Sequence, residues 1–265
     1  MKTRVLTALA LIPPVLAAIY CVSPWPLFGL GLLLLFIGSQ ELDQLVGRSW
    51  SLAGAALWLA GAGAVAVYSS NAAFVLLALG LAALLAGIFG ILYSLRVHTG
   101  IVQTLVSAGW IAGPVISIMT LHMATMGPPP PWFDWRAPLL MAVIPLWAGD
   151  TAAIFAGKAF GKRLLAPTIS PKKTVEGAIG NFLACLIAAY LLGICLRVGP
   201  AVSIACGLAA GILGQAGDLF QSWMKRKSGV KDSGSILPGH GGILDRIDSI
   251  LFTAPVVAAI LIFSR

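Results

Sequence analysis

Charged residues are scarce in this sequence of 265 residues, because only 10% are Asp, Glu, Lys or Arg while 59% are hydrophobic. Soluble domains are close to half apolar and a quarter charged. A soluble fold could not bury this much apolar surface. The alternating strands that a membrane barrel requires are also missing, and long apolar runs take their place. Membrane-spanning helices remain, since each helix pairs its own backbone groups.

Cysteine is equally sparse. All four residues lie within apolar runs, at Cys21, Cys185, Cys195 and Cys206. No CxxC pair occurs and no His stands at ligand spacing, so we interpret them as small packing residues rather than metal ligands or disulfides. A cleaved signal peptide is not expected either, because Pro13 and Pro14 interrupt the first apolar run and no small-residue cleavage site follows.

Nine apolar windows approach the roughly 17–23 residues that cross about 30 Å of hydrocarbon, the second being the shortest. They lie at 4–22, 26–40, 51–68, 71–93, 104–124, 138–157, 175–196, 200–219 and 246–264. No internal repeat of the kind found in many transporters is present. The sequence therefore predicts an all-α, polytopic transmembrane bundle of about nine helices.

The distribution of basic residues predicts the orientation of this bundle. With a cytoplasmic N-terminus, fourteen of the 17 Lys and Arg residues fall on the cytoplasmic side, and only Arg136, Arg197 and Arg265 fall outside. This split follows the positive-inside rule. Two cytoplasmic loops, near 158–174 and 220–245, hold nine of the fourteen. Retention and attraction to anionic headgroups explain that charge, but not the other residues of the loops.

Acidic residues are the scarcest charged type, with nine in all. Five of them lie within or at the edges of the last four apolar windows: Asp150, Glu176, Asp218, Asp245 and Asp248. A charge at a helix centre costs about 2.5–3.5 kcal/mol on insertion scales, so acids in such positions usually have a function. The alternative is that each one caps a helix or pairs with a nearby Lys or Arg.

Asp245 and Asp248 are three residues apart and would share a helix face. At about 5–6 Å, two carboxylates repel by roughly 3 kcal/mol at an effective dielectric near 20, unless one is protonated or a cation lies between them. Mg²⁺ fits this role, because it prefers oxygen ligands and is commonly held by one or two carboxylates plus substrate phosphates. Asp218 ends the preceding window on the same side and would complete a metal site.

Cations and glycines lie between these acids, at Lys225, Arg226, Lys231–Asp232 and Pro238-Gly239-His240-Gly241-Gly242. Glycine lets the backbone approach a phosphate closely, and exposed N–H groups with nearby Lys and Arg neutralise its charge. Together with the acids, this composition predicts a polyphosphate site. Taken alone, the glycine run is a turn and His240 is an ordinary loop side chain.

The residues of this region resemble the signature of the phosphatidate cytidylyltransferase family. The matching stretch is Ser222-Trp-Met-Lys225-Arg226-x4-Lys231-Asp232-x5-Pro238-x-His240-Gly241-Gly242-x2-Asp245-Arg246-x-Asp248. A second block resembles the preceding loop of the family, with Asp150-Thr151, Gly157-x3-Gly161-Lys162 and Leu165-x-Pro167-x-Ile169-Ser170-Pro171-Lys172-Lys173-Thr174-x-Glu176-Gly177. It departs from the family pattern at Ile154, Lys158 and Val175, where Tyr, Arg and Trp are usual.

The resemblance implies a Mg²⁺-dependent homodimer with a two-cation centre that transfers a cytidylyl group from CTP to phosphatidic acid, giving CDP-diacylglycerol and pyrophosphate. No nucleic-acid partner is expected. We expect one integral unit of a bacterial inner membrane, with N-terminal transmembrane helices over 1–137 and catalytic transmembrane helices with cytoplasmic loops over 138–265. The N-terminus and the active site would both be cytoplasmic.

The resemblance assigns the metal-binding acids, and we assign the other roles as a hypothesis about the mechanism. Asp218 and Asp245 would bind metal, with Asp248 nearby, and the triphosphate or leaving pyrophosphate would be held by Lys225, Arg226, Lys231 and Arg246. Lys172 and Lys173 would bind the lipid phosphate or the nucleotide, oriented by Thr174 and Glu176, unless these lysines are only positive-inside residues. His240 is the further catalytic candidate. The other substrate-binding candidates are Asp150, Lys162, Ser170, Ser222, Asp232, Gly241 and Gly242.

Three other functions fit parts of the pattern. A CTP-using kinase of a lipid alcohol also needs a basic, metal-bearing face, but it would release CDP rather than pyrophosphate. A transporter of an anionic solute would use buried acids as an ion path, but it does not explain the signature. A CDP-alcohol phosphatidyltransferase would require a DGxxAR pattern, which the sequence lacks.

Overall fold

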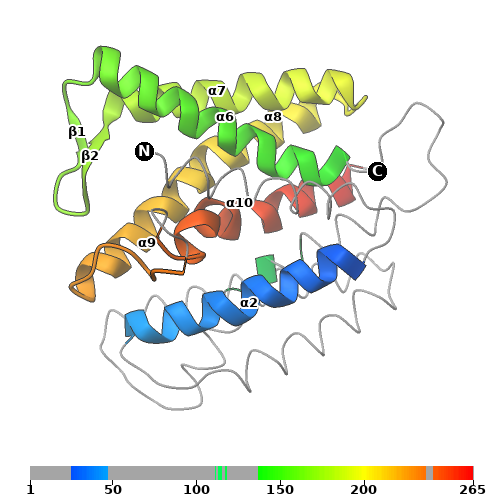
Figure 1. Ribbon diagram of the computed structural model, residues 1–265. Helices are drawn as coiled ribbons and strands as arrows, with labels where there is room; N and C mark the ends of the chain where they lie inside the picture. The colour runs from blue at the N-terminus through cyan, green and yellow to red at the C-terminus, as the bar shows by residue number, and fades with distance from the viewer. Residues whose placement is uncertain are drawn as a thin grey trace. The chain divides into compact units, whose positions relative to one another are not determined.

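The computed structural model describes residues 25–46, 111, 113, 114, 117, 137–236 and 241–264, and the chain is mostly helical. Its elements are α2 (Trp25–Val46), α6 (Ala137–Phe160), β1 (Leu164–Ala166), β2 (Ser170–Thr174), α7 (Val175–Cys195), α8 (Pro200–Ala209), the π-helix η1 (Ala210–Gly214), α9 (Gln215–Lys227) and α10 (Leu244–Phe263) (Figure 1). Two compact units divide the chain. The first is Met1–Ala124 with Ser228–Ile247, and the second is Thr125–Lys227 with Asp248–Arg265.

Within the described residues, three helices are long and apolar enough to cross a membrane, namely Leu139–Phe160, Val175–Cys195 and Pro200–Lys227. They confirm three of the predicted windows. A chain with helices of this length and composition is a membrane protein. α2 extends the short second window to 22 residues, and α10 covers the last window. The windows at 4–22, 51–68 and 71–93 and most of 104–124 lie outside the described residues. The total of nine helices therefore stays a prediction, as does the division of the chain at 137.

The all-α prediction is wrong for one segment. β1 and β2 form a two-stranded antiparallel sheet in which Leu164 pairs with Thr174 and Ala166 pairs with Ser170. The chain reverses over 167–169, where Pro167 favours a turn and the Ile169 N–H donates to the Ala166 carbonyl at 3.2 Å. β1 is Leu-Leu-Ala and β2 is Ser-Pro-Lys-Lys-Thr. Neither strand carries the two-residue hydrophobic alternation that predicts a strand from sequence.

Small residues allow α6 and α7 to lie side by side in the second unit (Figure 1). A Cβ added at Gly149 would lie 2.5 Å from Sγ of Cys185, and one at Gly180 would lie 2.6 Å from Cβ of Ala156. Close backbone approach is a usual source of helix association in a membrane, where burial of apolar surface gives little driving force. The core of this unit contains buried Leu146, Cys185 and Ala210.

The described cysteines are free thiols. Cys185 and Cys206 are buried, in agreement with a packing role, whereas Cys195 is exposed. Cys21 lies outside the described residues. The Sγ of Cys185 donates to the Pro145 carbonyl at 3.2 Å, which adds a polar contact between α7 and α6.

α8, η1 and α9 follow one another without a break from Pro200 to Lys227, over 28 residues. The Gln215 side chain stabilises the π-turn, because its Nε2 donates to the carbonyls of Gly211 at 2.7 Å and Ala178 at 3.2 Å. Single π-turns inside α-helices occur frequently at functional sites. Here the π-turn lies directly before the polar α9.

Gly207 is a point of close contact between α8 and α7. A Cβ added there would lie 2.9 Å from Cα of Leu186 and 3.2 Å from the carbonyl oxygen of Cys185. Because these are backbone atoms, they cannot move aside cheaply, and we expect Gly207→Ala to destabilise the protein by about 1–3 kcal/mol. The measurement is the thermal unfolding midpoint in detergent. Gly29→Ala is the matched control, since nothing lies within 4 Å of its added Cβ. Equal losses in both variants would contradict the prediction.

Candidate active site

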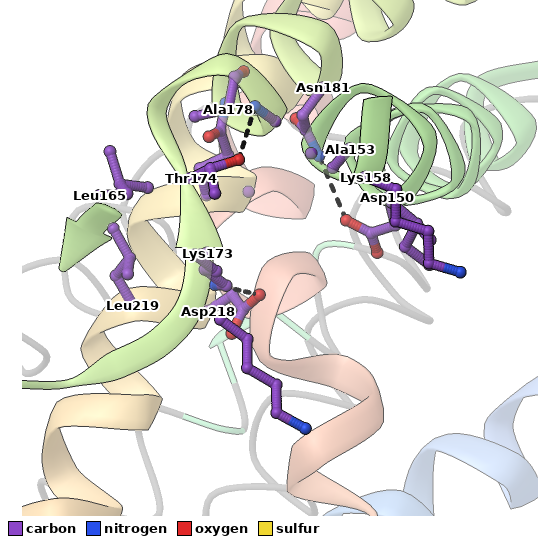
Figure 2. A pocket seen from close by; sticks show the side chains of 16 residues that line it. Asp150, Ala153, Lys158, Leu165, Lys173, Thr174, Ala178, Asn181, Asp218 and Leu219 are labelled. Atoms are coloured by element: carbon purple, nitrogen blue, oxygen red, sulfur yellow. Dashed lines mark hydrogen bonds and ion pairs between the residues drawn. The ribbon is translucent and has the colours of Figure 1, made fainter. Parts of the chain in front are cut away.

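A cavity of about 500 Å³ in the second unit gathers part of the predicted site (Figure 2). Its wall comes from α6, the hairpin, α7, η1 and α9, and its polar lining is Asp150, Lys158, Lys172, Lys173, Thr174, Asn181, Gln215 and Asp218. Five of these residues, Asp150, Lys172, Lys173, Thr174 and Asp218, are candidates from the sequence. β2 belongs to the second sequence block, and the start of α9 lies just before the first signature residue, Ser222. The fold therefore brings the two blocks together at the cavity.

Lys173 and Asp218 form the most direct polar contact of the cavity. The Lys173 Nζ lies 2.5 Å from Oδ2 of Asp218, and both side chains are half-buried (Figure 2). One turn further along α9, the Ser222 hydroxyl donates to Oδ1 of Asp218 at 3.4 Å. Both oxygens of this carboxylate are thus engaged by neighbouring donors.

Asp248 adds a second carboxylate to this pair. It lies close enough to Asp218 for the two charges to repel, and close enough to Lys225 and Lys173 for both to attract it. Asp248 is half-buried, and Lys225 is buried with 8% of its surface exposed. We call Lys173, Asp218, Lys225 and Asp248 the Asp218 cluster. Two lysines here balance two carboxylates that would otherwise repel each other.

The hairpin is fixed to the start of α7 by Thr174 and Glu176. The Thr174 Oγ1 caps α7 by accepting from the Gly177 N–H at 3.1 Å. The Glu176 Oε2 accepts from the backbone N–H groups of Lys162 at 3.1 Å and Arg163 at 3.3 Å. The Arg163 guanidinium lies 3.6 Å from the other carboxylate oxygen. In these contacts Glu176 holds the backbone that leads into β1.

The other end of the hairpin is joined to α9. Ser170 begins β2, and the Arg226 Nε donates to the carbonyl of Ile169 at 3.2 Å. Lys172 is exposed on the cavity wall. A predicted phosphate-binding arginine therefore also has a structural contact with the turn.

Asp150 lines the cavity from α6. Its Oδ1 accepts from Nδ2 of Asn181 on α7 at 3.2 Å (Figure 2). Asn181 is buried and did not appear among the candidates. An amide side chain inside an otherwise apolar window was the available signal for it.

The first unit holds the other signature residues. Asp245 fastens the loop before α10, because its Oδ2 accepts from the N–H groups of Ser233 at 2.9 Å and Gly242 at 3.0 Å. Gly241 has a φ of +79°, in the left-handed region that glycine tolerates best. The exposed signature residues of this unit are Lys231, Asp232 and Arg246. His240 lies outside the described residues, as do Pro238 and Gly239.

Glu41 on α2 is a polar residue that the sequence reasoning missed. It is 2% exposed, and it accepts from the Ser233 hydroxyl at 2.9 Å and from the N–H groups of Ile243 at 2.8 Å and Leu244 at 2.9 Å. The available signal was an acid at the end of a long apolar run in a chain with few acids. The positive-inside test did not use it, since that test counts only Lys and Arg.

Comparison with known proteins decides the family. The model of the cytidylyltransferase family matches residues 2–264. The chain belongs to this family. It is similar to phosphatidate cytidylyltransferase of Staphylococcus aureus (strain COL), with 45% identity over 128 residues, covering 48% of this chain and 49% of that protein. It is also similar to phosphatidate cytidylyltransferase of Bacillus subtilis (strain 168), with 45% identity over 119 residues, covering 44% of each. The chain thus spans about half the length of the curated relatives it matches.

A cation site in this cytidylyltransferase family member can be judged from the donors present. Among the described residues, no three His, Cys, Asp or Glu side chains come together at metal-binding distances. Asp218 and Asp248 nevertheless offer two neighbouring carboxylates, and the Lys173 ammonium already contacts one of them. Mg²⁺ is commonly held by one or two carboxylates together with substrate phosphates and water. The Asp218 cluster therefore fits a cation bound jointly with a phosphate substrate.

Proposed function

We propose that this chain transfers a cytidylyl group from CTP to phosphatidic acid, giving CDP-diacylglycerol and pyrophosphate. The observation that carries the proposal is the Asp218 cluster at the cavity of a cytidylyltransferase family member. Both substrates bring phosphate groups and negative charge. A site that combines carboxylates for a cation with lysines for phosphate oxygens suits such a pair of substrates.

The reaction requires alignment and charge neutralisation more than a strongly activated side chain. A phosphate oxygen of phosphatidic acid attacks the α-phosphorus of CTP, the bond from this phosphorus to the oxygen that bridges to the β-phosphate breaks, and pyrophosphate leaves. Because the lipid phosphate is already nucleophilic, the protein gains most by holding the two groups in line. Lys172 and Lys173 would hold phosphate oxygens at the cavity wall, and Lys225, Arg226, Lys231 and Arg246 would hold the triphosphate or the pyrophosphate.

Mg²⁺, when bound, neutralises the phosphate oxygens involved in displacement. Asp218 and Asp248 would hold it. The signature also assigns Asp245 to metal binding, and this role of Asp245 rests on the signature alone. His240 remains a proposed catalytic residue on the same ground.

The finer features of topology and assembly are also proposals. They are about nine spans, a cytoplasmic N-terminus and active site, a bacterial inner membrane and a homodimer. Fourteen of 17 basic residues on one side support the orientation, and the family resemblance supports the dimer.

The direct test follows radioactive label from the α-phosphate of CTP. Purified protein in detergent, with phosphatidic acid and Mg²⁺, is expected to transfer label into lipid and to release one pyrophosphate for each labelled lipid. EDTA should reduce transfer to background, and excess Mg²⁺ should restore it, since the substrate phosphates and carboxylates need a cation between them. Label in free CDP with none in the lipid would contradict the proposal and favour a lipid-alcohol kinase.

A further inference from the structure

Two carboxylates fasten the segment that precedes α10 in the first unit. Glu41 contacts both sides of this segment, at Ser233 and at Ile243 and Leu244. Asp245 does the same with the backbone of Ser233 and Gly242. Ser233 and the three residues Gly242–Leu244 are thereby all bonded to acidic side chains.

These bonds change the interpretation of the glycine-rich loop. The N-terminus of a helix attracts anions through its free N–H groups and its dipole. In α10 the N–H groups of Ile243 and Leu244 already donate to Glu41, and that of Gly242 donates to Asp245. The anion position at the start of α10 is therefore filled by a side chain of the protein. Phosphate groups must use other donors, and the cationic side chains of this segment are Lys231 and Arg246.

The surroundings of Glu41 select a carboxylate of this length. A Cβ added at Gly234 would lie 2.7 Å from Oε1 of Glu41, and one added at Gly242 would overlap both Oε2 of Glu41 and the Ser233 hydroxyl. Leu42 and Leu244 beside it are fully buried. Three donors meet the two oxygens, so an amide in place of the carboxylate would turn an NH₂ group towards a donor.

We infer that Glu41 is a positioning residue for nucleotide binding, acting through Ser233 and the first turn of α10. By holding the N–H groups of Ile243 and Leu244, it sets the place of this turn, which carries Asp245 and Arg246. This inference rests on the proposed function, because that function assigns Arg246 to the phosphates of CTP. Glu41 itself need not touch the substrate.

Steady-state kinetics of Glu41→Gln tests the inference. We expect kcat/KM for CTP to fall about 10- to 100-fold, the usual loss when a residue that orients a ligand-binding group is changed, with a raised KM for CTP and an unchanged KM for phosphatidic acid. A purely structural role would lower the amount of active protein and leave both KM values unchanged. Gln44→Ala is the matched control, because Gln44 is exposed on the same helix. Wild-type KM for CTP in Glu41→Gln would overturn the inference.

Ser233→Ala provides a milder variant that removes one of the three bonds and keeps the carboxylate. It should raise the KM for CTP by a smaller factor, and the double variant with Glu41→Gln should show less than the sum of the two free-energy changes, since the two residues share one bond. Full additivity in the double variant would contradict a shared action.

Limited tryptic cleavage tests the anchoring without using activity. Lys231 is exposed at the start of the fastened segment, and we expect faster cleavage after Lys231 in Glu41→Gln than in wild type or Gln44→Ala. Unchanged cleavage would overturn the anchoring role, even if cytidylyl transfer is demonstrated. Conversely, absence of cytidylyl transfer in the wild type would refute the proposed function, whereas faster cleavage in the variant would still support the anchor.

Discussion

Asp218→Asn is expected to leave a folded, membrane-inserted protein whose kcat for CDP-diacylglycerol formation is about 10²- to 10³-fold lower. The substitution keeps the shape of the side chain but removes the negative charge that pairs with Lys173. It also leaves Asp248 as the one carboxylate among the described residues of the Asp218 cluster, which weakens any cation held there. Initial rates at saturating CTP and phosphatidic acid, over a series of Mg²⁺ concentrations, measure the effect.

The Mg²⁺ series separates a metal role from a general loss of structure. The amount of Mg²⁺ that gives half-maximal rate should rise in Asp218→Asn. Asp134→Asn is the control, because Asp134 lies two residues before Arg136, which the distribution of basic residues predicts on the opposite side of the membrane. A normal rate for Asp218→Asn at all Mg²⁺ concentrations would remove Asp218 from the mechanism.

Lys173→Ala should give the second-largest effect, with kcat/KM reduced about 10²-fold and a higher requirement for substrate. Lys173 contacts Asp218 and lies near Asp248, so its loss removes the ammonium that contacts Asp218 and leaves Lys225 as the remaining lysine of the Asp218 cluster. It also removes a donor for phosphate oxygens from the cavity wall. Substrate titration of the purified variant in detergent gives both parameters.

Lys227→Ala is the matched control for this change. Lys227 lies at the end of α9, exposed and 5.1 Å from the ring centre of Trp223, and we assign it no part in the site. Its removal tests whether loss of any cytoplasmic positive charge lowers activity. If Lys173→Ala and Lys227→Ala gave the same kcat/KM, the role of Lys173 would be limited to setting the orientation of the protein in the membrane.

The membrane helices were the most predictable part of the fold, because their signal is local. An apolar run of sufficient length must pair its backbone within itself in a lipid environment, and α6, α7 and the Pro200–Lys227 helix appear where the windows placed them. The β1–β2 hairpin was missed because its stability comes from contacts made elsewhere. Glu176 accepts from the backbone N–H of Arg163, directly before β1, and Arg226 donates to the Ile169 carbonyl in the turn. Such bonds leave no periodic pattern in the sequence.

The candidate site shows the same limit. Spacing within one helix identified Asp245 and Asp248 as a pair, but not the contact between Lys173 and Asp218, which lie 45 positions apart in the numbering. The bond from Ser233 to Glu41 spans 192 positions. The residue types predicted a site for phosphate and a cation. Only the tertiary structure shows that Asp218 contacts a lysine while Asp245 accepts from backbone N–H groups.

The π-helix Ala210–Gly214 has a consequence for how this chain can vary. A π-turn closes its backbone hydrogen bonds over five residues instead of four, so it holds one residue more than an α-turn. Deleting one residue from this stretch should therefore give a continuous α-helix in which Asp218 keeps its direction. Deleting one residue between Asp218 and Lys225 would instead rotate Lys225 by about 100° relative to Asp218. Natural homologues should therefore tolerate a one-residue change of length in the π-turn but not between Asp218 and Lys225.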